Sequence, residues 1–595
     1  MKKLLLYFFA VSLLQLNAQT IPTNRIFNWK HSGYNGSFSS TVPVIDVTSF
    51  GAIGDSTTDN TTAFWNAMNS ISGQKVIYFP AGNYLFATPI QLPDSTTLRG
   101  ASADSTKLTF DFNGTVGNGI NIIGAIGSNF VNVLSGAERY SNSIVVDDVT
   151  QFADGDYLEL QQTNGSWDTQ PISWAQNCIG QILKINLING DTIFLDSELR
   201  IDYDYALNPV VRKIVPRTEI SLECFQIARR DSVHVGVCIN IYLNYAVNCK
   251  IKGIESSKSI GSHIELDACS DCSISNCYIH HNFEYDGTST HGYGITLFGH
   301  TGQCRVENNI MKHLRHSFSF QAGANGNVNA YNYSLDPNRS EFPSDFGADI
   351  SMHGHFAYSN LFEGNIVQNI QIDQTWGPSG PLNTFFRNRA ELYGILMTSG
   401  TVQSDSLYFV GNEVTNSGLF MGNYTLTGSG HFEFGNNIKG TITPSGTTPL
   451  PDSSYYLDSL PTFWTSSLFP TIGIPNAIGS GTNAAKERYM SGINLATCEN
   501  TINTNIQDQN EVNGITVYPN PFTNELNIRW TSSNQSTLKF ELIDLQGRVI
   551  EMKIENSRPG INYFTFHSLK LCKGIYFLKI TGRTTREIVK VISGN

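Results

Sequence analysis

The sequence predicts an all-β protein built around a solenoid of stacked short strands, followed by a separate small β domain. Composition is the first observation: 52 of 595 residues are glycine, 11% are aromatic and only 15% are charged, which is typical of many strands and tight turns. The second observation is a repeat in the middle of the chain. Asparagines beside β-branched or aromatic residues recur there every 23 to 33 residues, at Asn248, Asn276, Asn309, Asn332, Asn365, Asn388, Asn412 and Asn437. Such a period indicates coils that bury a continuous core only by stacking, and asparagine suits their corners because it tolerates left-handed backbone.

The N-terminus predicts a secretory signal over residues 1–18. Lys2 and Lys3 precede an apolar run from Leu4 to Leu14, and Ala18 offers a small residue for cleavage. The apolar run is too short to span a bilayer, and no later segment is long enough. We therefore expect an exported protein with no transmembrane segment.

Residues 46–86 predict a cap for the first coil. Asp59 can accept hydrogen bonds from the first N–H groups of an amphipathic helix over Thr61 to Ile71. Two β runs follow from Lys75 to Phe86, bent at a Pro-Ala-Gly-Asn turn. One short helix followed only by strands suits a lid over an otherwise open sheet edge.

The remaining segments divide the chain further. Alternating strands and a Gly-Asp turn over about residues 143–203 predict a lateral β insertion in a solenoid that runs from 44 to 440. Residues 441–510 are rich in Ser, Thr, Pro, Gly and Asn, which predicts an irregular cap and linker. Residues 511–595 again show alternating strands, enough for a small β-sandwich.

Four of the ten cysteines follow the coil period. Cys224, Cys249, Cys277 and Cys304 are 25, 28 and 27 residues apart, which favours buried thiols stacked in one column. Disulfides remain the alternative, because an exported chain meets an oxidising environment.

The start of the solenoid resembles that of the pectate lyase and polygalacturonase superfamily. The resemblance rests on Phe50 to Asp55 (FGAIGD), the helix after it, and Tyr78 to Tyr84 (YFPAGNY), in that order. It implies a right-handed parallel β-helix with an N-terminal capping helix, in an extracellular protein that handles polysaccharide. The Asn-x-Asp, Asp-Asp and Gly-His-Gly pattern of polygalacturonases is not recognisable, which puts that particular activity in doubt.

The last 80 or so residues resemble the C-terminal sorting domain of the type IX secretion system of Bacteroidetes. Tyr518-Pro-Asn-Pro, Leu545-Gln-Gly-Arg and Gly574-Ile-Tyr-x-x-Lys stand in the expected order. This resemblance implies the type IX machinery as a partner and a location outside the cell or on its surface. The formal net charge of −12 argues against a nucleic acid partner, since phosphates require a basic surface, and we expect a monomer.

Histidines concentrate where the substrate groove is expected. Nine of 13 lie between His263 and His355. Counting four residues past each asparagine predicts a polar column of Lys252, His280, His313, Asp336 and Asn369, which is either a groove for a linear polymer or a solvated face. The residues we predict to bind substrate are Lys252, His280, His355 and Trp376.

One candidate mechanism is β-elimination on an acidic polysaccharide. His316 or His353 would take the proton, Arg315 or Arg387 would offset the substrate carboxylate, and His313 adds a second imidazole to the HLRHS run. A calcium ion held by carboxylates could serve instead of the arginine, and we predict no other cofactor.

The other candidate mechanism is hydrolysis. Glu265 and Asp267 lie on the same side of a strand, about 7 Å apart, in the range of an inverting glycosidase. The histidines place elimination slightly ahead of hydrolysis. A glycan-binding or adhesin β-helix without catalysis is the third possibility, for which exposed Trp376 would serve as a platform.

Overall fold

The computed structural model describes residues 20–34, 36, 42–232, 238–464, 466, 468–492, 495–498, 516–532, 536–544, 548–558, 560–567, 571–581 and 586–594. These residues form two compact units, one ending at Cys498 and one beginning after it. The predicted signal peptide and the last 12 residues of the predicted cap and linker, 499–510, lie outside the described residues. No helix in the described part of the chain is long and apolar enough to cross a membrane.

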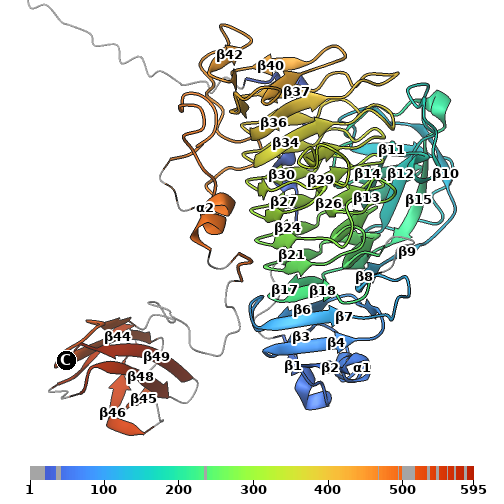
Figure 1. Cartoon of the computed structure of the whole chain (residues 1–595). Coiled ribbons are helices and arrows are strands. Elements are labelled where there is room, and N and C mark those ends of the chain that lie inside the picture. Colours follow the sequence, from blue (N-terminus) through green and yellow to red (C-terminus); the bar gives the residue numbers. More distant parts are fainter. Residues whose placement is uncertain are drawn as a thin grey trace, which may run out of the picture. The chain divides into compact units, whose positions relative to one another are not determined.

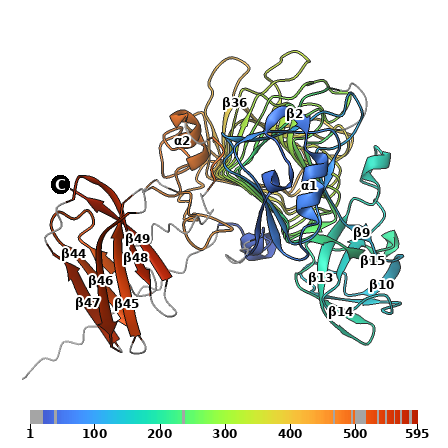
Figure 2. The same cartoon turned by 90° about the horizontal axis from the view of Figure 1, so that it is seen from below.

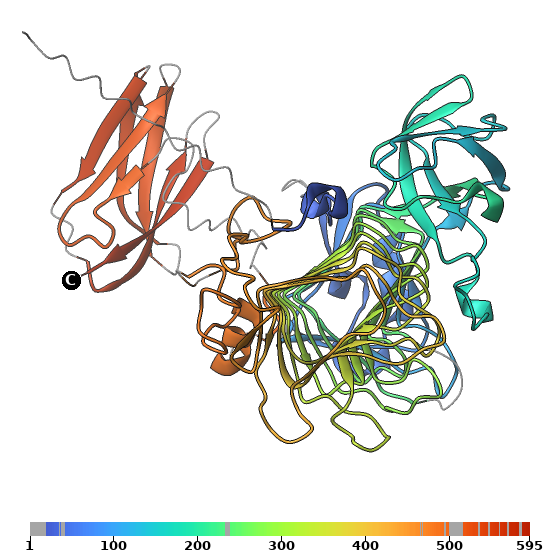
Figure 3. The same ribbon diagram turned by 90° about the horizontal axis from the view of Figure 1, so that it is seen from above.

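The first unit is a right-handed parallel β-helix whose coils stack along one axis (Figure 1). Seen from above, the coils superimpose, with short strands joined by sharp turns (Figure 3). One face is a 12-stranded parallel sheet, sheet A, made of β1 (Val44–Asp46), β3 (Lys75–Phe79), β6 (Thr96–Gly100), β17 (Ser221–Glu223), β21 (Lys250–Lys252), β24 (Ser273–Ser275), β27 (Arg305–Glu307), β30 (Val328–Ala330), β33 (Leu361–Glu363), β35 (Thr384–Phe386), β37 (Tyr408–Val410) and β40 (Phe432–Phe434).

The other faces belong to one 21-stranded sheet that contains two ladders sharing β34 (Ile366–Ile372) and β36 (Arg389–Met397). We call them sheets B and C. Sheet B continues through β2 (Asp55–Asp59), β4 (Gly82–Phe86), β7 (Thr106–Phe110), β18 (Gln226–Arg229), β22 (Glu255–Ser257), β25 (Tyr278–His280), β28 (Ile310–Lys312), β31 (Tyr333–Leu335), β38 (Glu413–Val414), β41 (Asn436–Ile438) and β42 (Thr441–Thr443). Sheet C continues through β5 (Ile90–Gln91), β8 (Ile120–Ile123), β19 (Ile241–Asn244), β23 (Ile264–Asp267), β26 (Tyr293–Phe298), β29 (His316–Phe320), β32 (Ala348–Met352) and β39 (Asn423–Thr425).

The capping helix closes the first coil as predicted. Helix α1 (Thr61–Met68) lies at the end of the solenoid (Figure 2) and places Phe64 and Met68 in the same core as the strands. The Asp59 carboxylate accepts a hydrogen bond of 3.0 Å from the backbone N–H of Thr61. The helix ends three residues before Ile71, the predicted last residue.

The asparagine ladder is confirmed from Asn309 to Asn412. The structure also shows which position of the turn the ladder asparagine occupies. Each side-chain oxygen accepts from the backbone N–H of the asparagine one coil earlier, through Asn309, Asn332, Asn365, Asn388, Asn412 and Asn436. Left-handed backbone falls on the preceding residue, such as Arg387, and not on the ladder asparagine. The predicted ends of the ladder were wrong, because Asn276 takes that left-handed position, Asn248 lies at another turn, and Asn436 replaces Asn437.

Cysteine and asparagine share these buried turn positions. The backbone N–H of Cys277 donates to the side-chain oxygen of Asn309. The backbone N–H of Cys304 donates to the side-chain oxygen of Asn327, which begins a second column of asparagines at the other end of the sheet A strands. In the register of sheet A, Cys249, Cys272 and Cys304 stand directly above one another. The predicted column of stacked thiols therefore exists with Cys272 in place of Cys224 and Cys277.

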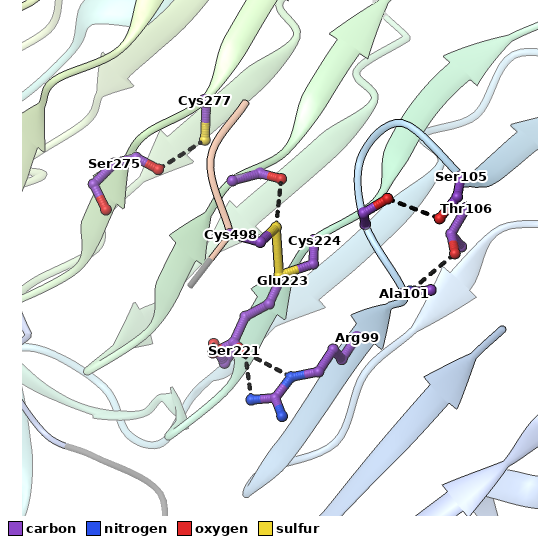
Figure 4. Close-up of a disulfide and its surroundings, with 12 residues drawn as sticks. Arg99, Ala101, Ser105, Thr106, Ser221, Glu223, Cys224, Ser275, Cys277 and Cys498 are labelled. Carbon is purple, nitrogen blue, oxygen red and sulfur yellow. Dashed lines mark hydrogen bonds and ion pairs between the residues drawn. A yellow bond between two sulfur atoms is a disulfide. The ribbon is translucent and has the colours of Figure 1, made fainter. Parts of the chain in front are cut away.

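Cys224 forms a disulfide with Cys498, the last residue of the first unit (Figure 4). The bond fastens the end of the C-terminal segment to the coil that holds β17. The close-up also shows Arg99 of β6 reaching Glu223, with an ion pair of 2.6 Å between neighbouring strands of sheet A.

A lateral sheet leaves the solenoid after β8 and returns at β16 (Arg217–Thr218) (Figure 1). Its seven antiparallel strands extend beyond 143–203 on both sides: β9 (Ala125–Ile126), β10 (Val131–Ser135), β11 (Ser143–Val146), β12 (Tyr157–Gln161), β13 (Gly180–Asn189), β14 (Thr192–Leu195) and β15 (Val210–Val215). Arg200, fully buried, anchors this insertion by donating from Nη1 to Oδ1 of Asn325 at 2.6 Å.

Sheet A is covered on its outer side by both ends of the first unit. Ile21 and Trp29 from the N-terminal segment pack with Leu450 and Tyr455 from the C-terminal segment against its strands. Helix α2 (Ala484–Ser491) packs in the same way on sheet B through Ala485.

The second unit is the small sandwich that the sequence predicts. One antiparallel sheet holds β43 (Thr516–Tyr518), β44 (Leu526–Ser532) and β47 (Gly560–Phe566), and the other holds β46 (Val549–Ser557), β45 (Ser536–Ile543), β48 (Gly574–Thr581) and β49 (Arg586–Ser593). Trp530 and Phe540 meet between the sheets with ring centres 5.2 Å apart.

Candidate active site

The outer face of sheet C carries a group of acidic, histidine and tyrosine side chains. Strand β23 alternates, so Ile264 and Leu266 enter the core while Glu265 and Asp267 point outward. The register places Glu265 between Tyr242 of β19 and Thr296 of β26, and Asp267 beside Phe298.

Glu265 and Asp267 are half-buried carboxyl groups in different surroundings. Burial, with a contribution from Asp267, raises the pKa of Glu265 to about 7. Among the described residues, the Ser262 hydroxyl donates a hydrogen bond of 3.1 Å to this carboxylate. Burial raises the pKa of Asp267 to about 6. Its carboxylate accepts from the Tyr242 hydroxyl at 3.2 Å and from Nδ2 of Asn244 at 3.1 Å, which favour its ionised form.

A second group of titratable side chains follows on the next strands. His316 on β29 lies against Tyr293 of β26 with ring centres 4.7 Å apart, and against His353 at 5.2 Å. Burial and the nearby charges of Arg315 and His353 hold the pKa of His316 well below its usual range, so the ring is neutral.

Asp373 closes this group. Its Oδ2 lies 2.8 Å from Nδ1 of His353. Burial alone would raise the pKa of Asp373, but His353 and the hydrogen bonds from Thr375 lower it, so the carboxylate is ionised.

Tyr293 connects the two groups. It belongs to the strand next to Glu265, its pKa is raised to about 12 mainly by burial, and the charges that act on it include Glu265 and Asp373. The guanidinium of Arg315 lies 4.9 Å from the centre of its ring. Of the residues predicted for the two mechanisms, Glu265, Asp267, His316 and His353 therefore lie together along sheet C.

Two predicted site residues serve the fold instead. Arg387 donates to the backbone carbonyls of Leu450, Asp452, Ile472 and Ile474 at 2.8–3.2 Å, so it holds the C-terminal segment and is not available to a substrate carboxylate. His355 has a fully buried side chain whose Nε2 lies 3.2 Å from Asp168 of the insertion, and it cannot touch a polymer.

The predicted polar column was also wrong. His280 of sheet B aligns with Lys312, one residue before His313, and Lys252 lies on sheet A. His313 stands at the turn after β28, where its Nδ1 contacts Asp336 at 2.9 Å. Loops of different length between coils shift the count, so a fixed offset from each asparagine does not follow one column.

The insertion brings charged groups that sequence patterns did not indicate. Glu159 of β12 accepts from Nε of Arg212 at 2.7 Å, and its other oxygen lies 2.9 Å from Nδ1 of His300, which follows β26. Burial alone would raise the pKa of Glu159, but His300 and Arg212 lower it to about 2. His300 is also among the charges that lower the pKa of Asp267, so this network borders the carboxyl pair.

Three described side chains could together hold a metal ion. Oxygens of Glu284 and Asp286 and a ring nitrogen of His291 all lie within 4.8 Å of one another. The same loop accepts a hydrogen bond of 2.8 Å from Nε of Arg315 at the carbonyl of His291. A set with an imidazole departs from the all-oxygen ligands that calcium prefers.

Two segments match known families. Residues 44–192 match the model of rhamnogalacturonase A/epimerase, pectate lyase-like, and residues 516–593 match that of the secretion system C-terminal sorting domain. No curated protein matches the sequence of the chain.

Solved structures resemble the chain at low identity. The tailspike protein gp49 from Pseudomonas phage LKA1 is 12% identical, over 65% of this chain and 81% of that one, with a TM-score of 0.40. The A-module of the mannuronan C-5 epimerase AlgE4 from Azotobacter vinelandii is 12% identical over 66% and 92%, with a TM-score of 0.36. The catalytic unit of a GH87 α-1,3-glucanase from Streptomyces thermodiastaticus is 12% identical over 70% and 68%, with a TM-score of 0.33.

The second unit fixes the destination of the chain. A sorting domain of this kind directs the protein through type IX secretion to the cell surface or the extracellular space. The β-helix therefore begins with a segment, residues 44–192, that is similar to the pectate-lyase-like rhamnogalacturonase A/epimerase family, and the chain also carries a type IX secretion C-terminal sorting domain.

Proposed function

We propose that this protein cleaves a polysaccharide on the outer face of sheet C by hydrolysis, with Glu265 as the acid and Asp267 as the base. The observation that carries the proposal is the carboxyl pair itself. Two half-buried carboxyls stand on one strand, and their surroundings keep Glu265 protonated to higher pH than Asp267. The pectate-lyase-like match and the sorting domain support a secreted, carbohydrate-active protein.

The reaction assigns one proton transfer to each group. Glu265 gives its proton to the glycosidic oxygen as the bond to the anomeric carbon breaks. Asp267, ionised, takes a proton from the water that attacks this carbon from the opposite side. Alternate residues of a strand stand about 7 Å apart, which leaves room for that water and predicts inversion at the anomeric carbon.

We favour hydrolysis over elimination because both predicted arginines are bound to backbone carbonyls of this protein. Elimination needs a group that offsets the carboxylate of a uronate, and Arg315 and Arg387 were the predicted ones. Arg387 is bound to the C-terminal segment, and Arg315 donates from Nε and Nη2 to the backbone carbonyls of His291 and Ser289 at 2.8 and 2.7 Å. Carboxylates, in contrast, border the site at Glu159, Asp267 and Asp373.

The test compares products and matched variants of the full chain. Neutral and acidic plant and algal polysaccharides would be incubated with the protein, and reducing ends and the ultraviolet absorbance of unsaturated sugars would both be recorded. We expect reducing ends without absorbance, and at least a hundredfold lower rate for Glu265→Gln and Asp267→Asn. Glu255→Gln is the control, because Glu255 lies on sheet B, where it contacts His280 at 3.3 Å.

One observation favours elimination as a second candidate. Neutral His316 is in contact with Tyr293, which lies on the strand next to Glu265, and together they could remove a proton and protonate a leaving oxygen. Glu265, protonated, would then hydrogen-bond the substrate carboxylate. Absorbance that rises with reducing ends, and that His316→Ala together with His353→Ala abolishes, would replace hydrolysis by this mechanism. Retention of a polymer without any cleavage would indicate a binding protein.

A further inference from the structure

An aromatic patch borders the candidate site where the lateral insertion meets sheet C. It consists of Phe298 at the end of β26, Trp174 from the insertion, and Trp376, which follows β34. Trp174 lies 6.1 Å from Phe298 and 6.1 Å from Trp376 between ring centres. Residues far apart in sequence thus assemble one apolar surface.

The patch is continuous with the polar groups of the site. Phe298 is the register partner of Asp267 on the adjacent strand, so the two side chains stand on the same face about 4.8 Å apart along the axis. At the other end, Trp376 lies three residues after Asp373, which contacts His353. The aromatic rings therefore extend along the site, from the carboxyl pair of Glu265 and Asp267 to the group that contains His353 and Asp373.

The indoles present surface that the protein does not cover. Trp376 keeps 37% of its surface exposed, and Trp174 is half-buried. Their planes meet at 73°, so the rings do not stack face to face on each other. Large exposed aromatic rings next to hydrogen-bonding groups are typical of surfaces that bind a ligand with one apolar and one polar side.

We propose that Trp174 and Trp376 form a sugar-binding subsite, in which a pyranose of the polymer packs its C–H face on an indole beside the carboxyl pair. The polymer then lies along the solenoid axis across sheet C, between the strands and the insertion. A pyranose fits this surface because its C–H groups form an apolar face while its hydroxyls reach the polar side chains at the margin. The identification of the ligand rests on the proposed function.

The test separates binding from cleavage. In the full chain carrying Glu265→Gln, which leaves the polymer intact, retention would be measured by affinity electrophoresis in gels that contain the polysaccharides of the activity panel. We expect Trp376→Ala and Trp174→Ala each to weaken binding about tenfold or more, with partial recovery in Trp376→Tyr and Trp174→Phe. Phe420→Ala is the control, because Phe420 is an exposed aromatic ring, 81% exposed, outside the patch.

In the active chain, the same two variants should raise KM on the polymer by a larger factor than they lower kcat. Unchanged binding in both alanine variants, or no polymer retained by the parent chain, would overturn the subsite. If the parent chain cleaves the polymer and the variants bind it as tightly as the parent, the subsite proposal fails while the hydrolytic function stands. Binding that depends on the tryptophans without any cleavage would support the subsite and remove the hydrolytic function.

Discussion

Replacing Asn365 by alanine tests the main element that holds successive coils in register. The Asn365 side chain is fully buried and makes four hydrogen bonds. Its Oδ1 accepts from the backbone N–H and from Nδ2 of Asn332, both at 3.0 Å. Its Nδ2 donates to Oδ1 of Asn388 at 2.9 Å and to the carbonyl of Asn329 at 2.8 Å.

The expected cost follows from these four bonds. Each contributes about 1 kcal/mol net, and a buried group left without its partner costs more, so Asn365→Ala should lower the free energy of unfolding by about 4 kcal/mol. The lost acceptor has a local consequence as well. The amide hydrogen of Asn332 should exchange with solvent much faster, while that of Asn365, which donates to Asn388, should stay protected.

Urea denaturation and amide hydrogen exchange of the full chain would measure both effects. The matched control is Asn437→Ala, since Asn437 is also buried but its side-chain oxygen has no hydrogen-bond partner in the described part of the chain. A loss below about 1 kcal/mol for Asn365→Ala, or an equal loss for both variants, would refute the ladder as a source of stability.

Three further predictions concern the site and the C-terminal segment. Activity should fall as pH rises through about 7, where Glu265 loses its proton, and should also fall as pH drops through about 6, where Asp267 gains one. A rate that stays constant from about pH 5 to 8 would contradict the assignment of acid and base. Arg387→Met removes five hydrogen bonds to carbonyls of the C-terminal segment, so trypsin should digest this segment at least tenfold faster than in the parent chain. An unchanged digestion rate would contradict this role of Arg387. Cys224→Ser with Cys498→Ser should likewise speed cleavage near residue 498 without lowering activity on polymer, and reduced activity would show that the bond also shapes the site.

The repeat made the solenoid predictable because it depends on local chemistry. The coils from Asn309 to Asn436 place a buried asparagine at the same turn, and this appears in the sequence as a spacing. Its exact position was not predictable: in coils that carry several asparagines, such as the one with Asn308 and Asn309, only the stacked neighbour shows which side chain enters the ladder.

Glu265 and Asp267 were predictable for a similar reason. Two acids separated by one apolar residue lie on one side of any strand, and the strand itself was evident. The partners that set their pKa values were not, because Tyr242 comes from the preceding coil and His300 is held by Glu159, 141 residues away in sequence.

The predictions that failed have one cause in common. Arg387 and His355 were judged from their own coils, but the groups that bury them come from residues 450–474 and from Asp168. A side chain is available to substrate only if no other segment covers it, and sequence spacing holds no information on coverage by a distant segment.

By itself, then, the sequence determined an exported all-β solenoid with a capping helix, an asparagine ladder, a carboxyl pair on one strand and a sorting domain. Those features follow from periods and motifs within one coil or one short segment. Only the tertiary structure decided that sheet A is covered, that sheet C carries the candidate site, and that Trp174 joins Trp376 beside it. These outcomes depend on which long loops fold back onto which face, because burial and pKa are set by neighbours in space.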